Sequence, residues 1–115
     1  MAVDVFAERL AKIRNRFMAA LPGTLDANDA TLPQLGGSAE AVAETYRRLH
    51  GIAGTGPTIG FAATGKAARA AEEILIGAYR GARSLTGDEA ASLKDALTAL
   101  RTAAQSELQV NGSGG

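Results

Sequence analysis

Nucleophilic or acid–base chemistry near neutral pH falls first on His50, because it is the only histidine among 115 residues and no cysteine is present. The residues before it have the spacing of a helix, which places Gly54 one turn further along the same face. A glycine there removes side-chain bulk beside the imidazole. This pair predicts a histidine exposed to the surface of another protein.

Other catalytic patterns are missing from the sequence. The glycines after His50 follow no strand and lack the Gly-Lys-Ser/Thr ending of a phosphate-binding loop. One histidine without cysteines or a tight acidic cluster cannot supply a metal site, so we expect none. The pairs Glu72-Glu73 and Asp88-Glu89 point about 100° apart on a helix. This excludes a shared proton and favours solvated or helix-start charges.

Charge and composition narrow the class of partner. Twelve basic and twelve acidic residues cancel, and the basic residues have no aromatics between them, so we expect neither nucleic acid nor a membrane surface as partner. No apolar stretch approaches the roughly 20 residues of a membrane span, and residues 1–4 lack the basic start of a secretion signal. The sequence favours one soluble, cytoplasmic domain, and the absence of cysteine suits that compartment.

The elements that must position His50 follow from apolar spacing. The first set recurs in steps of three and four and consists of Phe6, Leu10, Ile13, Phe17 and Leu21. It predicts an amphipathic helix over 6–21. Pro22-Gly23 is expected to break or kink this helix and to leave 24–32 as a short accessory helix before Pro33.

Ser38 is placed to cap the helix that carries the histidine. The inward side of that helix holds Val42, Tyr46, Leu49, Ala53 and Gly56. His50 and Gly54 lie about 90–120° from the centre of this stripe, on its flank toward solvent. A tight reversal at Pro57 is expected next, with Thr58 as a candidate cap for a third helix from residue 60 or 61 to about 79.

A final helix is predicted after residue 86. Thr86 and Glu89 match a capping box, and the residues expected inward are Leu93, Leu97, Leu100, Ala104 and Leu108. Residues 109–115 read as a flexible tail, an interdomain linker or a cloning remnant. With no strand pattern, the chain is expected to be all-α: an antiparallel four-helix bundle over 1–108 with a short N-terminal accessory helix.

The run from His50 to Glu72 resembles the phosphoacceptor region of histidine-phosphotransfer (HPt) domains of two-component phosphorelays. The matching positions are His50, Ile52, Gly54, Thr55, Gly56, Ile59, Gly60, Phe61, Ala68 and Glu72. The helix order over about 4–108 also fits the four-helix bundle of that family. One departure matters, because the family often has a lysine where this chain has Ala53. Thr64 and Ala71 also stand where leucines are common.

The resemblance implies a function and its partners. His50 would be the phosphoacceptor, taking a phosphoryl group from a receiver-domain aspartate and returning it to another. Gly54 would leave room for the incoming receiver. The partners implied are response-regulator receivers, with a hybrid histidine kinase as a further candidate, and Mg²⁺ is expected on the receiver, with no cofactor on this chain. We expect a monomer that acts as a phosphotransfer intermediate, with no ATP-binding site of its own.

Two alternatives come from other classes. The helix pair of a histidine kinase also bears an exposed histidine, but Gly51 and Thr55 stand where such kinases usually have an acidic residue and a proline. The other alternative is a degenerate helical bundle that docks signalling proteins and carries no phosphate, and Ala53 is its best support. Phosphotransfer from a receiver, followed by detection of phosphohistidine, separates this alternative from the main interpretation.

The cation missing at Ala53 is expected to come from elsewhere. With a reversal centred between 58 and 59, an antiparallel hairpin puts His50 level with about residue 67, between Lys66 and Arg69. Arg47, one turn before His50, is the third candidate. Lys66 is favoured because its flexible ammonium can follow a phosphoryl group, although each of the three also fits an ordinary solvated charge.

Overall fold

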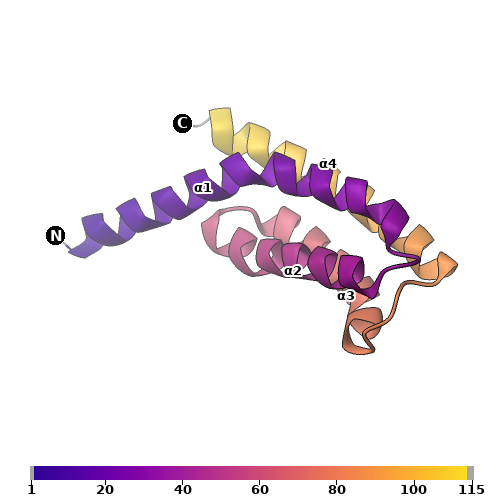
Figure 1. The fold of residues 1–115 in the computed structure, drawn as a ribbon. Helices are drawn as coiled ribbons and strands as arrows, with labels where there is room; N and C mark the ends of the chain where they lie inside the picture. Colours follow the sequence, from indigo (N-terminus) through magenta and orange to yellow (C-terminus); the bar gives the residue numbers. More distant parts are fainter. Residues whose placement is uncertain (1, 114–115) are drawn as a thin grey trace.

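The computed structural model describes residues 2–113, which form four helices and two 3-10 turns (Figure 1). The helices are α1 (Ala2–Thr31), α2 (Ala39–Thr55), α3 (Ala62–Arg80) and α4 (Gly87–Ser113); the turns are η1 (Leu32–Gln34) and η2 (Gly56–Ile59). Each helix packs on its neighbours in the order α1, α2, α3, α4, and α4 returns to α1. No strand occurs in the part of the chain that the structure describes. The predicted all-α bundle is confirmed.

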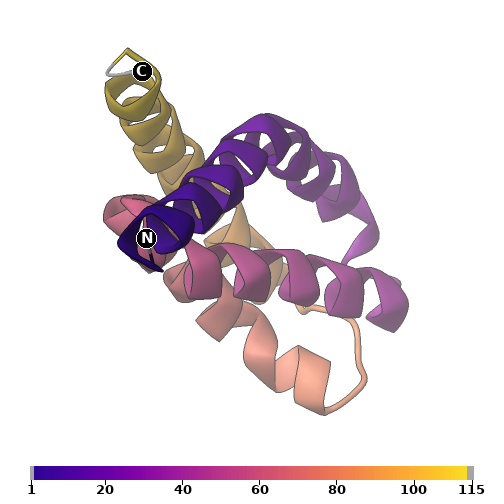
Figure 2. The same ribbon diagram turned by 90° about the vertical axis from the view of Figure 1, so that its left-hand side faces the viewer.

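Helix α1 does not break at Pro22, so the predicted accessory helix is wrong. Residues 24–31 are the second half of one helix that begins at Ala2. A proline inside a helix costs about 3 kcal/mol, but Leu21 and Leu25 are both buried on the same side of α1. Burying two leucines contributes about 3–6 kcal/mol, which favours continuation. Figure 2 shows α1 changing direction along its length, and Pro22 supplies the physical cause of a bend.

The start of α2 follows the prediction. The Ser38 hydroxyl accepts a hydrogen bond from the Ala41 amide at 3.0 Å and caps the helix. On the inward side Val42, Leu49 and Ala53 are buried, and Tyr46 is partly buried. This cap and this stripe fix the rotation of α2, and His50 is left on the exposed flank.

The reversal between α2 and α3 is longer than expected. Gly60 follows the turn η2 and caps it. Its φ of 92° is in the left-handed region that glycine adopts freely. Phe61 then precedes α3 without a side-chain cap, so the expected cap at Thr58 is wrong. Glu107 of α4 takes that role, because its carboxylate accepts from the Thr64 amide at 2.6 Å and from the Thr64 hydroxyl at 2.7 Å.

Close packing fixes the same turn. A Cβ added to Gly65 would lie 2.6 Å from Cδ of Pro57, so only a glycine lets the start of α3 approach η2. The Phe61 ring is fully buried and meets the Phe17 ring with centroids 5.1 Å apart. These contacts bind α1, η2 and α3 into one unit.

Helix α4 begins as predicted but ends later in the chain than predicted. The capping box is confirmed: the Thr86 amide donates to Glu89, and the Glu89 amide donates to the Thr86 hydroxyl. Leu93, Leu97 and Leu100 are buried as expected. The helix, however, continues to Ser113 instead of giving way to a tail at 109. Near its end the Asn111 amide nitrogen donates to the Glu107 carbonyl at 2.8 Å. Residues 114–115 of the expected tail lie outside the described residues.

Among the described residues, no helix combines the length and the apolar character that crossing a membrane requires.

Candidate functional site

The His50 side chain is 67% exposed on the flank of α2. Its Nδ1 lies 2.7 Å from Oε1 of Glu72 on α3, and the Glu72 side chain is only 10% exposed. Because an ionised carboxylate only accepts hydrogen bonds, Nδ1 carries the proton and donates it. The lone pair of the neutral ring is therefore on Nε2. The contact fixes the tautomer. Nε2, the nitrogen that carries the lone pair, has no hydrogen-bond partner among the described residues.

Tyr46 lies one turn before His50 and stacks beside it. The two ring centroids are 5.7 Å apart with planes inclined by 13°. On its other side Tyr46 stacks on Tyr79 of α3, with centroids 4.1 Å apart and planes inclined by 10°. Burial raises the pKa of the Tyr46 phenol, and the neighbouring Glu72 carboxylate raises it further. The sequence placed Tyr46 in the core and gave Tyr79 no role.

Glu72 is the site residue whose contact sequence reasoning missed. The expectation of a solvated carboxylate is wrong for Glu72, which is buried, whereas Glu73 is exposed. The error has a geometric source. The contact with His50 puts the centre of the hairpin near residue 61, because η2, Gly60 and Phe61 lengthen the reversal. The acidic position in the family resemblance was the one signal that could have found Glu72.

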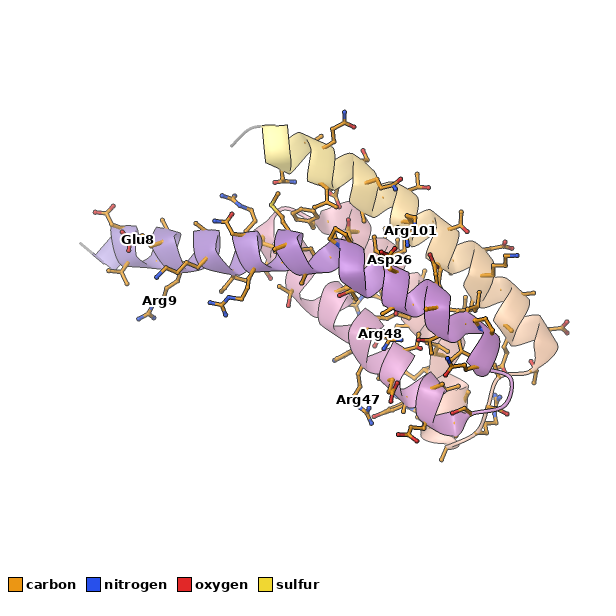
Figure 3. All side chains as sticks on the ribbon, turned by 45° about the horizontal axis from the view of Figure 1, so that its top comes forward. Glu8, Arg9, Asp26, Arg47, Arg48 and Arg101 are labelled. Atoms are coloured by element: carbon orange, nitrogen blue, oxygen red, sulfur yellow. The ribbon has the colours of Figure 1, made fainter. Side chains whose placement is uncertain are left out.

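The same shift of the hairpin centre changes how close each candidate cation lies to the level of His50. Lys66 precedes Glu72 by six residues and so lies about 9 Å nearer the turn, whereas Arg69 lies about 4.5 Å from that level. Lys66, Arg69 and Arg47 are all exposed. None of them has a hydrogen bond or an ion pair to another described residue. Register therefore favours Arg69 over Lys66, and Figure 3 shows Arg47 pointing away from the helices.

Gly54 and Ala53 occupy opposite environments although they are neighbours. A Cβ added to Gly54 would meet no atom within 4 Å, so this side of α2 is open next to the histidine. Ala53 is only 3% exposed and packs in the core. This burial agrees with the predicted inward stripe, and it means that Ala53 contributes little to the exposed surface around His50. The open approach to His50 is over Gly54.

A groove runs between α1 and α2 on the other side of His50. It has a volume of about 230 Å³ and is lined by Phe17, Ala20, Leu21, Thr24, Arg47, Arg48, Gly51 and Ile52. No pattern in the sequence predicts this groove, because the groove depends on how α1 crosses α2. The groove brings apolar surface close to the exposed histidine.

Arg48 lies beside this groove and is bound inside the scaffold. Its Nε donates to Oδ1 of the buried Asn28 at 2.8 Å. Its Nη2 donates to the hydroxyls of Thr31 and Thr45 at 3.0 and 3.1 Å. These bonds join α2 to the second half of α1, so Arg48 is a structural residue.

Metal ligands do not gather anywhere in the described chain: no group of three or more His, Cys, Asp or Glu side chains could hold an ion. The site as described consists of an exposed imidazole, a carboxylate that holds its Nδ1, and open space over Gly54, an arrangement in which Nε2 could act as a nucleophile.

Comparison with known families agrees with this site. The family model of the Hpt domain matches residues 2–103, a range that includes α1, α2, α3, most of α4, and both His50 and Glu72. Comparisons with curated proteins and with solved structures found no match. The match spans most of the chain, and the chain therefore belongs to the Hpt domain family.

Proposed function

We propose that this protein relays a phosphoryl group between receiver-domain aspartates through His50. Membership of the Hpt family gives the chain a histidine-phosphotransfer role in two-component signalling. The observation that carries the assignment to His50 is the 2.7 Å contact between Nδ1 and Glu72, because it leaves the Nε2 lone pair directed away from the scaffold. The relay partners are receiver domains, with a hybrid histidine kinase as a further candidate.

The transfer step balances without another reactant. The Nε2 lone pair attacks the phosphorus of the aspartyl phosphate, the N–P bond forms, and the P–O bond to the aspartate breaks. The receiver carboxylate leaves as an anion. The phosphorylated ring keeps its Nδ1 proton and is a cation, so the Glu72 carboxylate at 2.7 Å stabilises it. In the reverse step a receiver carboxylate attacks phosphorus, and the electron pair of the N–P bond returns to Nε2.

The receiver supplies the remaining charge stabilisation. The donor set of the described residues does not fit a resident Mg²⁺ site, so the ion that neutralises the phosphoryl oxygens belongs to the receiver's acidic pocket. This chain contributes position and access: Glu72 orients the ring, and Gly54 leaves the approach open.

The test is transfer from a receiver that carries a radiolabelled aspartyl phosphate. The parent should take up label that is stable to alkali and labile to acid, as a phosphohistidine is. His50→Gln should take up none while it keeps the helical content and melting temperature, because the side chain is mostly exposed and its amide is a poor nucleophile. Acid-labile label on His50→Gln would show that another residue accepts the group.

The second candidate is a docking module that carries no phosphate. The observation that favours it is Ala53, which leaves no lysine beside the histidine and is buried. A parent protein that binds the receiver but never acquires acid-labile label would establish this alternative.

A further inference from the structure

Three rings form a continuous stack across α2 and α3 at the site. Tyr79, Tyr46 and His50 follow one another, with centroid separations of 4.1 and 5.7 Å and nearly parallel planes. Tyr79 is on α3 with Glu72, seven residues or two helical turns further along the same face. Tyr46 thus lies between His50 and Tyr79 in the stack and joins the histidine to α3 through ring contacts.

The Glu72 carboxylate is incompletely satisfied by this arrangement. Oε1 accepts from His50, whereas Oε2 is buried and has no hydrogen-bond partner among the described residues. A buried carboxylate oxygen without a donor is unfavourable and calls for one. The neighbouring carboxylate raises the pKa of the Tyr46 phenol, but the Tyr46 hydroxyl does not satisfy Oε2.

The His50 ring needs restraint beyond one hydrogen bond. The χ2 torsion of a histidine is broad, and a turn of the ring about it exchanges the nitrogen that faces Glu72 for a carbon. Such a turn would separate Nδ1 from the carboxylate and misdirect Nε2. The Tyr46 ring, stacked at 13° to the imidazole, opposes rotation of the plane.

We propose that Tyr46 is a positioning residue for phosphoryl transfer: its stacked ring holds the imidazole plane beside Glu72, so that Nε2 faces the receiver. The inference rests on the proposed function of His50. The competing explanation is that Tyr46 only fills space between α2 and α3. That explanation predicts a loss of stability without any change at the histidine ring.

The first experiment reads the ring itself and needs no phosphoryl transfer. Because His50 is the only histidine, the ¹⁵N signals of labelled histidine report this site alone. In the parent the shifts should show a protonated Nδ1 and an unprotonated Nε2. Tyr46→Leu should mix the tautomers, whereas Tyr46→Phe, which keeps the stacked ring, should match the parent. Unchanged tautomers in Tyr46→Leu would overturn the proposal.

The second experiment is transfer kinetics from a labelled receiver. Tyr46→Leu should lower the maximal rate about tenfold with the half-saturating receiver concentration unchanged, and Tyr46→Phe, which keeps the ring, should transfer at the parental rate. Phe6→Leu is the matched control, because Phe6 is an exposed aromatic residue on α1 outside the stack, and it should change neither readout.

The two experiments separate the possible failures. A raised half-saturating concentration with a normal maximal rate would make Tyr46 a docking residue and contradict the positioning role. If the parent itself accepts no label, the proposed function fails, and the tautomer measurement alone still decides whether Tyr46 orients the ring.

Discussion

Arg48 and His50 lie two residues apart on α2 and serve opposite purposes. Two residues correspond to about 200° around a helix, so Arg48 faces α1 and His50 faces α3. Arg48 makes three hydrogen bonds, to Asn28, Thr31 and Thr45. The His50 side chain has one hydrogen-bond partner among the described residues, Glu72, which is bound through Nδ1 and not through Nε2. A polar side chain on a helical bundle can react when the surrounding helices satisfy only part of its hydrogen-bonding capacity.

The difference implies that stability and transfer can be separated by mutation. Changes on the α1 side of α2 should lower the free energy of unfolding and leave the chemistry of the folded protein intact. Changes on the His50 flank should do the reverse. The following variants test this separation.

Arg48→Met should have the largest effect on stability. It removes the only donor to Asn28 Oδ1, and Asn28 is fully buried with its Nδ2 also without a partner among the described residues. We expect the free energy of unfolding in urea to fall by about 2 kcal/mol. The folded variant should accept phosphoryl groups at the parental rate. Asn28→Leu in the same background should restore part of the loss, and slow transfer by folded Arg48→Met would contradict the separation.

Gly54→Val, on the His50 flank of α2, should slow transfer without lowering stability. The added side chain stands in open space beside the imidazole, so transfer should slow about tenfold while stability stays equal or rises. Rates with a labelled receiver and a thermal melt measure the two quantities.

Gly65→Ala is the matched control for Gly54→Val. Its Cβ would lie 2.6 Å from Pro57, so it should lower the melting temperature and leave transfer by the folded protein unchanged. If Gly54→Val melts early but transfers normally, Gly54 serves packing and the open approach is wrong.

The exposed cations near His50 can be tested for a contribution to the rate of transfer. We expect at least one of Arg47→Ala, Lys66→Ala and Arg69→Ala to slow transfer several-fold at low salt, equivalent to about 1 kcal/mol. Register makes Arg69 and Arg47 the stronger candidates. Lys94→Ala on α4, also exposed, is the control. Parental rates in all three variants would mean that the receiver alone neutralises the phosphoryl charge.

The smallest effect is expected at the start of α4, outside both regions. The Arg83 guanidinium and the Thr86 amide hold the pKa of Glu89 at about 2, below its ordinary 4.5. Because the folded pKa is the lower one, this contact stabilises the protein above pH 4.5 and is lost as pH falls toward 2. Glu89→Gln should lose less melting temperature than the parent over that interval. An equal loss in both proteins would assign acid sensitivity to other carboxylates.

Local features of the structure could be read from the sequence, and contacts between helices could not. Apolar spacing, the Ser38 cap and the Thr86–Glu89 box depend on residues within a turn or two, so they gave the helices and the exposed flank of α2. The partner of His50 depends on the length of the reversal. A shift of the centre from between 58 and 59 to about 61 moves the opposite residue by twice that amount, from near 67 to Glu72.

Two other predictions were wrong for the same reason, because they also depended on contacts between helices. Continuation of α1 through Pro22 depends on the burial of Leu21 and Leu25 by other helices, which outweighs the local preference for a break. The cap of α3 comes from Glu107, which is 43 residues away from Thr64 in the chain. A pattern confined to one helix contains no information on either contact.

In the proposed relay Glu72 holds Nδ1 and leaves Nε2 to accept the phosphoryl group, and one spectrum tests this arrangement directly. Protein labelled with ¹⁵N-histidine, phosphorylated by a receiver, should show a single phosphohistidine whose ³¹P–¹⁵N coupling identifies Nε2 as the bonded nitrogen and whose Nδ1 remains protonated. A phosphoryl group on Nδ1, or a receiver that loses its phosphoryl group while His50 stays unmodified, would contradict the account.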